Sequence, residues 1–318
     1  MSEEELKSLC ESKNVFKGRA VWLYWPSELY SFGKYIRKYG YYPSFLPLAV
    51  YSDHSGPTFS DIPYLHEKET NAEFFLAHRK EKVIKYKEIT GKKAYTLYSP
   101  SVFYRRYNLI KQDENASGTI CFPEHSLLSE HSNFNIKKYC DDLKMLPIEF
   151  HPIKLCLHMH DVNNDTFKQY MENGFEVLSA GNTSDYRFVE RLYDIIKKAK
   201  FISSNSVGTI TLLSIEMRIP FFIYGNKQSS INISNKNLPK GIIKEPDHKQ
   251  FKYLKNKLSI SEDFKVSKYN KKIIFEAESA LGLYDGISRK KMFIVLYLAL
   301  LSWIIKFKWI YFLKSKLK

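Results

Sequence analysis

An alternation of short apolar runs and helical patterns between residues 119 and 224 constrains the fold more than any other feature of this chain. The predicted strands are 119–123, 153–159, 175–179, 200–203 and 220–224, and the predicted helices between them are 136–146, 165–172, 185–199 and 209–217. Strands joined by helices must lie parallel, with right-handed crossovers, so that helices cover both faces of the sheet. We therefore expect a Rossmann-like domain whose ligand binds at the carboxyl ends of its strands.

The N-terminal third shows a weaker α/β pattern. It contains predicted strands at 20–25 and 93–98, an apolar run at 44–50, and predicted helices at 27–38 and 72–87. A chain of 318 residues is long enough for two domains. We predict an α/β protein with two Rossmann-like domains, in which residues 1–113 form an N-terminal domain, residues 114–270 a second domain, and residues 271–318 C-terminal helices.

Polar residues follow each predicted strand of the middle domain. Parallel strands end at one edge of a sheet, so these residues are expected to lie together there. The candidate ligand-binding residues are His125, Ser126, His160, Thr183, Asp185, Ser204, Asn205, Ser206, Gly208 and Thr209. Each of them also has a purely structural explanation, because Ser, Asn and Asp commonly cap helices.

The stretch SSNSVGT, residues 203–209, joins a predicted strand to a predicted helix. The first backbone N–H groups of a helix lack internal partners and lie at the positive end of its dipole, which favours an anion. No Gly-Lys-Ser/Thr follows, so the stretch is not a Walker loop, and GxGxxG is also missing. Phosphate binding is therefore expected without ATP hydrolysis or NAD chemistry.

A Ser-rich strand end, a glycine, a helix carrying Glu216 shortly before Ile219-Pro220, and an apolar strand together resemble the donor half of GT-B glycosyltransferases. The resemblance covers residues 118–225. It implies that residues 114–270 form a nucleotide-sugar donor domain and residues 1–113 an acceptor-side domain. It also implies that the strand–helix turn holds the donor phosphates and that Glu216 binds the ribose. It points to bacterial enzymes of surface polysaccharide or lipopolysaccharide biosynthesis.

In that family, a base that activates the acceptor comes from the N-terminal domain. Asp53 and His54, within SDHSGP, are our catalytic candidates, although a simple turn explains the same residues. The family generally uses no metal, so we expect no cofactor besides the nucleotide-sugar co-substrate. The motif HMHD, residues 158–161, is the alternative metal site, since two histidines of an HxH strand share one face.

The C-terminal segment is apolar from residue 292 to 305 and then basic and aromatic. Interfacial aromatic residues and clustered basic residues suit an anionic leaflet. We expect an amphipathic helix that binds anionic inner-leaflet lipids through residues 289–318, with a tilted span, a core helix or a dimer contact as alternatives. The acidic N-terminus carries no signal-peptide pattern, and unpaired cysteines favour a reducing compartment, so a cytoplasmic, peripheral location is expected.

A formal charge of +15 favours an anionic partner, but no nucleic-acid-binding motif accompanies it. The predicted function is transfer of a sugar from a nucleotide donor to a lipid-linked or surface-glycan acceptor at the cytoplasmic membrane face. A nucleotide-sugar epimerase, or a phospho-sugar or phosphoglycerol transferase, is one alternative. A non-catalytic, membrane-tethered polyanion-binding protein is another.

Overall fold

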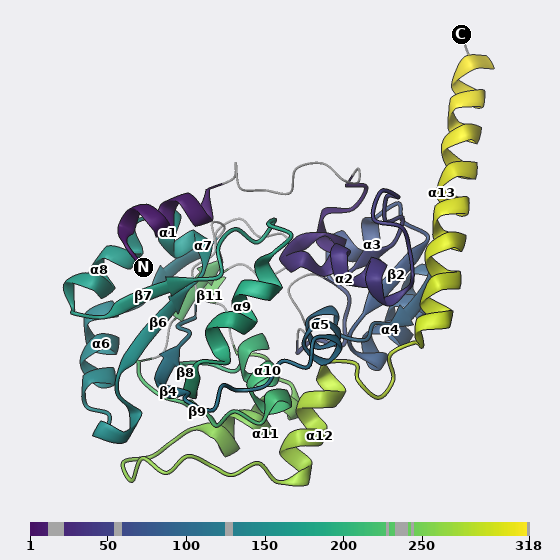
Figure 1. Ribbon diagram of the computed structural model, residues 1–318. Helices are drawn as coiled ribbons and strands as arrows, with labels where there is room; N and C mark the ends of the chain where they lie inside the picture. The colour runs from purple at the N-terminus through teal and green to yellow at the C-terminus, as the bar shows by residue number, and fades with distance from the viewer. Residues whose placement is uncertain are drawn as a thin grey trace. The chain divides into compact units, whose positions relative to one another are not determined.

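A computed structural model describes residues 1–11, 22–53, 59–124, 130–226, 229–232, 241–242 and 245–316 (Figure 1). The chain forms two compact units. Unit 1 comprises residues 1–15 and 105–278, and unit 2 comprises residues 16–104 and 279–318. This division differs from the predicted boundaries, because the N-terminal helix belongs to the middle domain and the C-terminal helix belongs to unit 2.

Unit 1 contains a five-stranded sheet with the strand order β7-β6-β4-β8-β9. The strands are β4 (Ser117–Cys121), β6 (Ile153–Leu157), β7 (Glu176–Ser179), β8 (Ala199–Ser204) and β9 (Phe221–Ile223). All four pairings are parallel, which confirms the α/β architecture with a parallel sheet. The direction of strand progression reverses between β4 and β8, and ligands of such sheets bind outside the carboxyl ends at that reversal.

The connections in unit 1 follow the predicted alternation closely. Its helices are α1 (Glu3–Cys10), α6 (Ile136–Lys144), α7 (Met159–Asn163), α8 (Thr166–Glu172), α9 (Phe188–Ile196), α10 (Thr209–Met217) and α11 (Lys249–Leu258), with the 3-10 turn η4 (Ile148–Phe150). A small antiparallel sheet pairs β10 (Ser229–Asn232) with β5 (Glu130–Asn133) and β11 (Gly241–Ile242). The helices α5 (Pro100–Tyr107) and α12 (Lys271–Ala280) include the residues at which the two units are divided.

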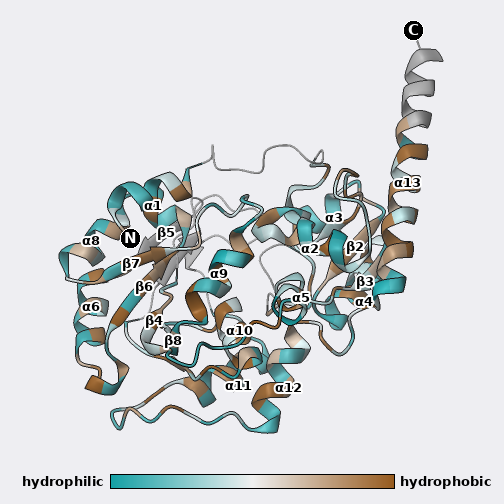
Figure 2. Cartoon of the chain, viewed as in Figure 1, coloured by the Kyte–Doolittle hydropathy of each residue, from teal (hydrophilic) through white to brown (hydrophobic). Residues whose placement is uncertain are grey.

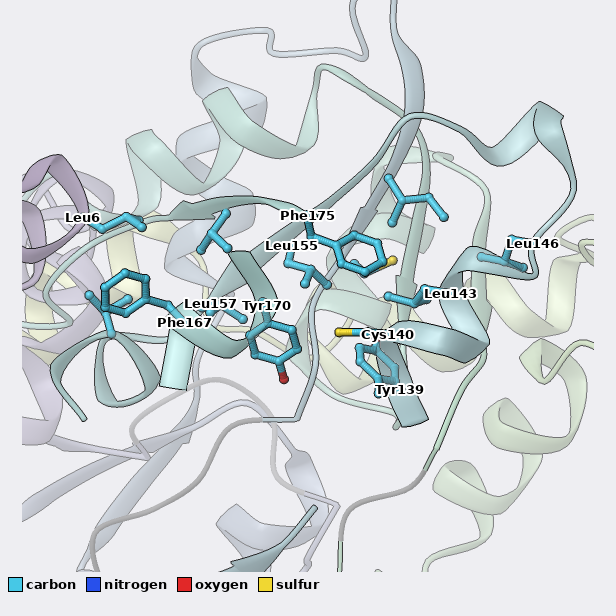
Figure 3. Packing of buried hydrophobic residues seen from close by; sticks show 14 of the residues in the cluster. Leu6, Tyr139, Cys140, Leu143, Leu146, Leu155, Leu157, Phe167, Tyr170 and Phe175 are labelled. Carbon is cyan, nitrogen blue, oxygen red and sulfur yellow. The ribbon is translucent and has the colours of Figure 1, made fainter. Parts of the chain in front are cut away.

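The core beneath one face of the unit 1 sheet explains why α1 belongs to this unit. Leu155 and Leu157 lie two residues apart in β6, so both point to the same face, where α6 and α8 cover them (Figure 3). Leu6 and Cys10 of α1 are fully buried in the same cluster. Their burial stabilises α1 against the sheet, and this long-range contact is not visible in the N-terminal sequence itself.

Unit 2 contains a three-stranded parallel sheet with the order β1-β2-β3. Its elements are β1 (Tyr51–Ser52), β2 (Phe74–Ala77), β3 (Lys93–Thr96), α2 (Phe32–Tyr39), α3 (Leu65–Glu69) and α4 (Lys80–Thr90), with 3-10 turns η2 (Trp25–Ser27) and η3 (Leu29–Ser31). The predicted helix 72–87 was wrong over its first half, which forms strand β2. The predicted strand 20–25 is not a strand over residues 22–25.

The C-terminal helix α13 (Arg289–Lys316) packs one face into the core of unit 2. Met292, Val295, Leu296 and Ala299 are buried there, in a cluster that includes residues of α2 and β2. Apolar residues also occur on its other faces, so α13 is not amphipathic in the simple sense that we predicted (Figure 2). No helix within the described ranges combines the length and hydropathy that crossing a bilayer requires.

Gly118 in the central strand β4 provides a test of how tightly the sheet is built. Its φ is +61°, and a Cβ atom there would lie 2.2 Å from the carbonyl oxygen of Pro152. We expect Gly118→Ala to lower the free energy of unfolding by about 3 kcal/mol or more, through backbone strain and steric overlap. Urea unfolding measures the change.

Gly174→Ala is the matched control for this substitution. Gly174 also has a positive φ, of +86°, but a Cβ atom there would meet nothing within 4 Å. We expect a cost of about 1 kcal/mol from the backbone conformation alone. Equal costs at the two positions would contradict the close packing of β4 against the segment that contains Pro152.

Candidate functional site

Asn205 connects three loops at the point where the unit 1 strand order reverses. Its side-chain Oδ1 accepts a hydrogen bond of 2.8 Å from the backbone N–H of Glu124, which follows β4. Its Nδ2 donates a 3.0 Å bond to the carbonyl oxygen of Asn226, which follows β9. Asn205 is buried. Asn205, which we predicted to bind phosphate, therefore links the segments that follow β4, β8 and β9.

The N-terminus of α10 lies directly beside Asn205 in the chain. Gly208 is its N-cap residue in extended conformation, and its backbone N–H donates a 3.1 Å bond to Thr211 Oγ1. Ser204 Oγ accepts a 3.3 Å bond from the backbone N–H of Ser206. A Cβ atom added at Gly208 would meet nothing within 4 Å, so the space beside this helix end is open. Ser204, Ser206, Gly208 and Thr209 lie around this helix end, and their role in donor binding stays a prediction.

This arrangement can accept an anionic group. The first-turn N–H groups of a helix have no intrahelical partner, and the dipole contributes roughly half a positive charge at this end. The start of α10 therefore combines two features that favour a phosphate, namely a helix N-terminus and a position at the strand-order reversal.

At the carboxyl ends of β6 and β7, the predicted ligand residues contact α1 and α7 of the same unit. Asn182, which follows β7, is buried and donates a 3.1 Å bond from Nδ2 to the carbonyl oxygen of Cys10 at the end of α1. The Thr183 hydroxyl and N–H contact the Met159 sulfur at 3.4 and 3.2 Å. His160 belongs to the short helix α7, where its N–H bonds to His158 Nδ1 at 3.3 Å.

Asp185 has a structural role rather than a ligand-facing position. The carboxylate accepts a 2.8 Å bond from the backbone N–H of Arg187 and forms a 3.0 Å ion pair with Arg191. Its side chain is largely buried, and both oxygens are occupied by these groups. The sequence-based assignment of Asp185 to donor binding is therefore replaced by a role in the turn that leads into α9.

Glu216 lies in the last turn of α10, about 10 Å along the helix axis from Thr209. Its side chain is fully buried, and Oε1 accepts bonds from Arg105 Nη2 at 2.6 Å and Arg106 Nε at 2.8 Å. A carboxylate held by two guanidinium groups at the far end of the helix is badly placed for a ribose at the first turn. These contacts place Glu216 in a buried ion-pair cluster, while its Oε2 has no hydrogen-bond partner among the described residues. The ribose role of Glu216 stays a prediction.

In unit 2, Asp53 forms a hydrogen-bonded pair with His78, which sequence reasoning missed. Asp53 follows β1 and His78 follows β2, so both lie at the carboxyl edge of the parallel sheet. Asp53 Oδ1 lies 3.0 Å from His78 Nδ1, and Oδ2 accepts a 3.2 Å bond from the His78 backbone N–H. Both side chains are almost completely buried.

The other imidazole nitrogen of His78 is left as an acceptor. A carboxylate only accepts hydrogen bonds, so in a neutral imidazole the proton resides on Nδ1 and faces Asp53. His78 Nε2 is buried and has no hydrogen-bond partner among the residues that the structure describes. A buried polar atom without a partner is costly, which makes Nε2 a candidate for contact with a ligand.

A second buried ion pair lies near Asp53. Lys82 Nζ donates a 2.7 Å bond to Glu67 Oε1, and both side chains are inaccessible to solvent. Burial by itself raises the pKa of Asp53, but the adjacent His78 and Lys82 outweigh it, so the pKa lies below its usual value. Burial raises the pKa of Glu67. Asp53 is thereby kept as the carboxylate that orients His78.

The sequence candidates His54, His125 and Ser126 lie outside the described residues.

His78 could have been found from the sequence, because the apolar run FFLA directly precedes it. A histidine that follows an apolar strand lies at the edge of the sheet. Within the described ranges, no group of three or more His, Cys, Asp and Glu side chains is arranged to hold a metal ion.

Glu216→Gln tests the structural role of the buried ion pairs. Breaking a buried pair leaves charges uncompensated, so we expect a loss of about 3 kcal/mol in unfolding free energy. Lys138→Gln, which removes an exposed pair with Asp142, is the control and should cost about 0.5 kcal/mol or less. Urea unfolding gives both values, and calorimetry at low temperature should find nucleotide affinity unchanged in the folded Glu216→Gln protein. Weakened nucleotide binding at unchanged stability would instead support the predicted ribose role of Glu216.

Comparison with known proteins does not assign a family. No family model matches the chain, and neither does any curated protein. Among solved structures, a variant of the wall teichoic acid polymerase TagF soaked with CDPG shows 9% identity and a TM-score of 0.37, covering 95% of this chain and 93% of that chain. The Anabaena protein HepE in complex with UDP shows 11% identity and a TM-score of 0.31, covering 86% and 76%. Values this low establish no shared fold, so function has to be argued from the site.

Proposed function

We propose that this chain is a glycosyltransferase that uses a nucleotide-sugar donor. The observation that carries the proposal is the open N-terminus of α10 at the strand-order reversal of the unit 1 sheet. The donor phosphates would bind the first-turn N–H groups, with the Ser206 and Thr209 hydroxyls as further donors. The pattern without a Walker lysine favours sugar transfer over nucleotide hydrolysis.

The same helix end supplies the main electrostatic contribution to the proposed reaction. As the bond between sugar and phosphate breaks, negative charge develops on the leaving phosphate. Helix N–H groups that are already in place stabilise that charge without reorganisation. In this proposal α10, rather than a metal ion, offsets the charge of the phosphates, and no further cofactor takes part.

We assign the base that activates the acceptor to His78. Asp53 holds the imidazole with the proton on Nδ1, so Nε2 can take the proton of an acceptor hydroxyl. In this proposal Asp53, our catalytic candidate from the sequence, acts through His78 rather than directly. Nε2 is buried in this structure, so the assignment requires a conformation in which Nε2 is exposed to the acceptor.

We also propose where the reaction takes place. The formal charge of +15 and the basic residues of the segment 289–318 favour an anionic membrane surface. A lipid-linked or growing surface-glycan acceptor, as in bacterial polysaccharide or lipopolysaccharide synthesis, would be met at the cytoplasmic face of that membrane. A peripheral location would raise the local concentration of such an acceptor.

Gly208→Asp tests the phosphate site without disturbing the helix. Asp is a favourable N-cap residue, the backbone conformation is extended, and there is room for a side chain. Its negative charge should weaken binding of UDP-, GDP- or CMP-linked donors about tenfold or more, since it opposes the phosphates at close range. Thermal shift with each donor, followed by calorimetry, measures the effect.

Gly208→Asn is the matched control, because it caps the helix equally well but carries no charge. It should retain most of the donor affinity. Equal donor binding by the Asp and Asn variants would disprove the phosphate site at α10. Turnover of a donor in the absence of any acceptor would instead indicate a nucleotide-sugar epimerase.

His78→Gln tests the proposed base. We expect the rate of sugar transfer to fall about a hundredfold or more, because general base catalysis contributes factors of this size. Asp53→Asn should also slow transfer, because an amide can stabilise the wrong imidazole tautomer. The donor-induced thermal shift should remain in both variants. A transfer rate that keeps its wild-type value and pH profile in His78→Gln would exclude His78.

A further inference from the structure

The helix α13 carries a second apolar face opposite the one that packs into unit 2. We call this face the outer stripe and define it as Ile294, Leu298, Leu301 and Ile305, whose exposed fractions are 54, 45, 54 and 56%. Met292, Val295, Leu296 and Ala299 of the buried face are 0–2% exposed. One helix therefore presents aliphatic side chains to the protein core on one side and to the surroundings on the other.

Helix periodicity shows that the outer stripe is a single face. The spacing of four, three and four residues keeps its members in line, and the stripe extends about 17 Å along the axis. The buried residues, at spacings of three, one and three, fall on the opposite side of the helix. Figure 2 shows apolar residues along the part of α13 beside the unit 2 sheet and beyond it.

The charges around the outer stripe indicate what covers it. Lys290 and Lys291 precede it, and no acidic residue occurs after Asp285. The neighbouring Arg289 donates to the backbone carbonyl oxygens of Lys38 and Tyr39, and Lys306, which follows the stripe, is ion-paired with Glu73. A second copy of this helix would bring Lys290 and Lys291 against their own counterparts in a parallel pair, and against the basic residues that follow position 306 in an antiparallel pair. An anionic lipid surface accommodates both the apolar stripe and the flanking positive charges.

We propose that the outer stripe inserts into the interfacial region of an anionic bilayer, with the helix axis along the membrane plane. The opposite face of residues 292–299 packs in the unit 2 core, so lipid cannot surround this part of the helix. The inference rests on the membrane location in the proposed function and specifies its partner and contact face. It also makes α13 part of unit 2 rather than a removable tail.

Because residues 292–299 belong to the core, the test uses point substitutions in the full-length chain rather than truncation. The variant is Leu298→Gln with Leu301→Gln, since Gln is a good helix former and both side chains are about half exposed. The matched control is Leu109→Gln with Ile148→Gln, two exposed apolar positions in unit 1. Urea unfolding confirms that each protein remains folded.

Co-sedimentation with vesicles of phosphatidylcholine, with and without phosphatidylglycerol, measures membrane binding. We expect the wild-type chain to bind the phosphatidylglycerol vesicles and to dissociate at high salt. The outer-stripe variant should bind about tenfold more weakly, because two half-buried leucines no longer contribute. The control should bind as wild type does, and Lys290→Gln with Lys291→Gln should reduce both binding and its salt dependence.

Three results would overturn the inference. They are no binding of the wild-type chain to phosphatidylglycerol vesicles, undiminished binding by the outer-stripe variant, or a wild-type dimer in light scattering that the same variant abolishes. Nucleotide-induced thermal shifts on the same preparations keep the proposals apart. A chain that binds vesicles through the outer stripe but binds no nucleotide would refute sugar transfer and leave the membrane contact standing.

Discussion

Parallel pairing of β4 with β6 on one side and β8 on the other is the constraint on which unit 1 depends. Ile153 and Phe201 both pair with Thr119 of β4, so the chain must progress in opposite directions from this strand. The connections after β4 and β8 therefore diverge at their carboxyl ends. The start of α10 lies at this divergence, and Asn205 fastens the surrounding loops by hydrogen bonds to their backbone.

The buried charged side chains of this protein include ion pairs that stabilise the fold and the Asp53–His78 pair, to which we assign chemistry. The Glu216 carboxylate is compensated by two arginines, and Lys82 compensates Glu67 in the same way. Both pairs need all their partners, because a single charge in a low-dielectric interior is strongly unfavourable. His78 Nε2 and Glu216 Oε2 are both buried without a hydrogen-bond partner among the described residues, while His78 Nδ1 is held by Asp53 and Glu216 Oε1 by two arginines. An imidazole held at Nδ1 by a carboxylate can take up a proton at Nε2, whereas the Glu216 carboxylate is ion-paired with two guanidinium groups. This chemical difference is why we assign chemistry to His78 and stability to Glu216.

Much of unit 1 could be predicted from local pattern, while unit 2 was predicted less well. Each unit 1 strand is a short apolar run bounded by polar residues, so its type and direction follow from periodicity and from the helices between. In unit 2, the run FFLA continues directly into the helical pattern of residues 80–90, and the two together resemble one helix. The turn at His78 and Arg79 has no glycine or proline to mark it. This error concealed His78 from the sequence-based site.

The sequence alone determined that the chain forms a parallel α/β sheet, that SSNSVGT begins a helix, and that the C-terminal segment is both apolar and basic. Only the tertiary structure decided which distant residues meet. His78 lies 25 residues from Asp53, and Glu216 lies 111 residues from Arg105. It also decided which face of α13 enters the core. The reason is physical: periodicity specifies the face of each element, but long-range pairs depend on strand order and packing, which no local pattern encodes.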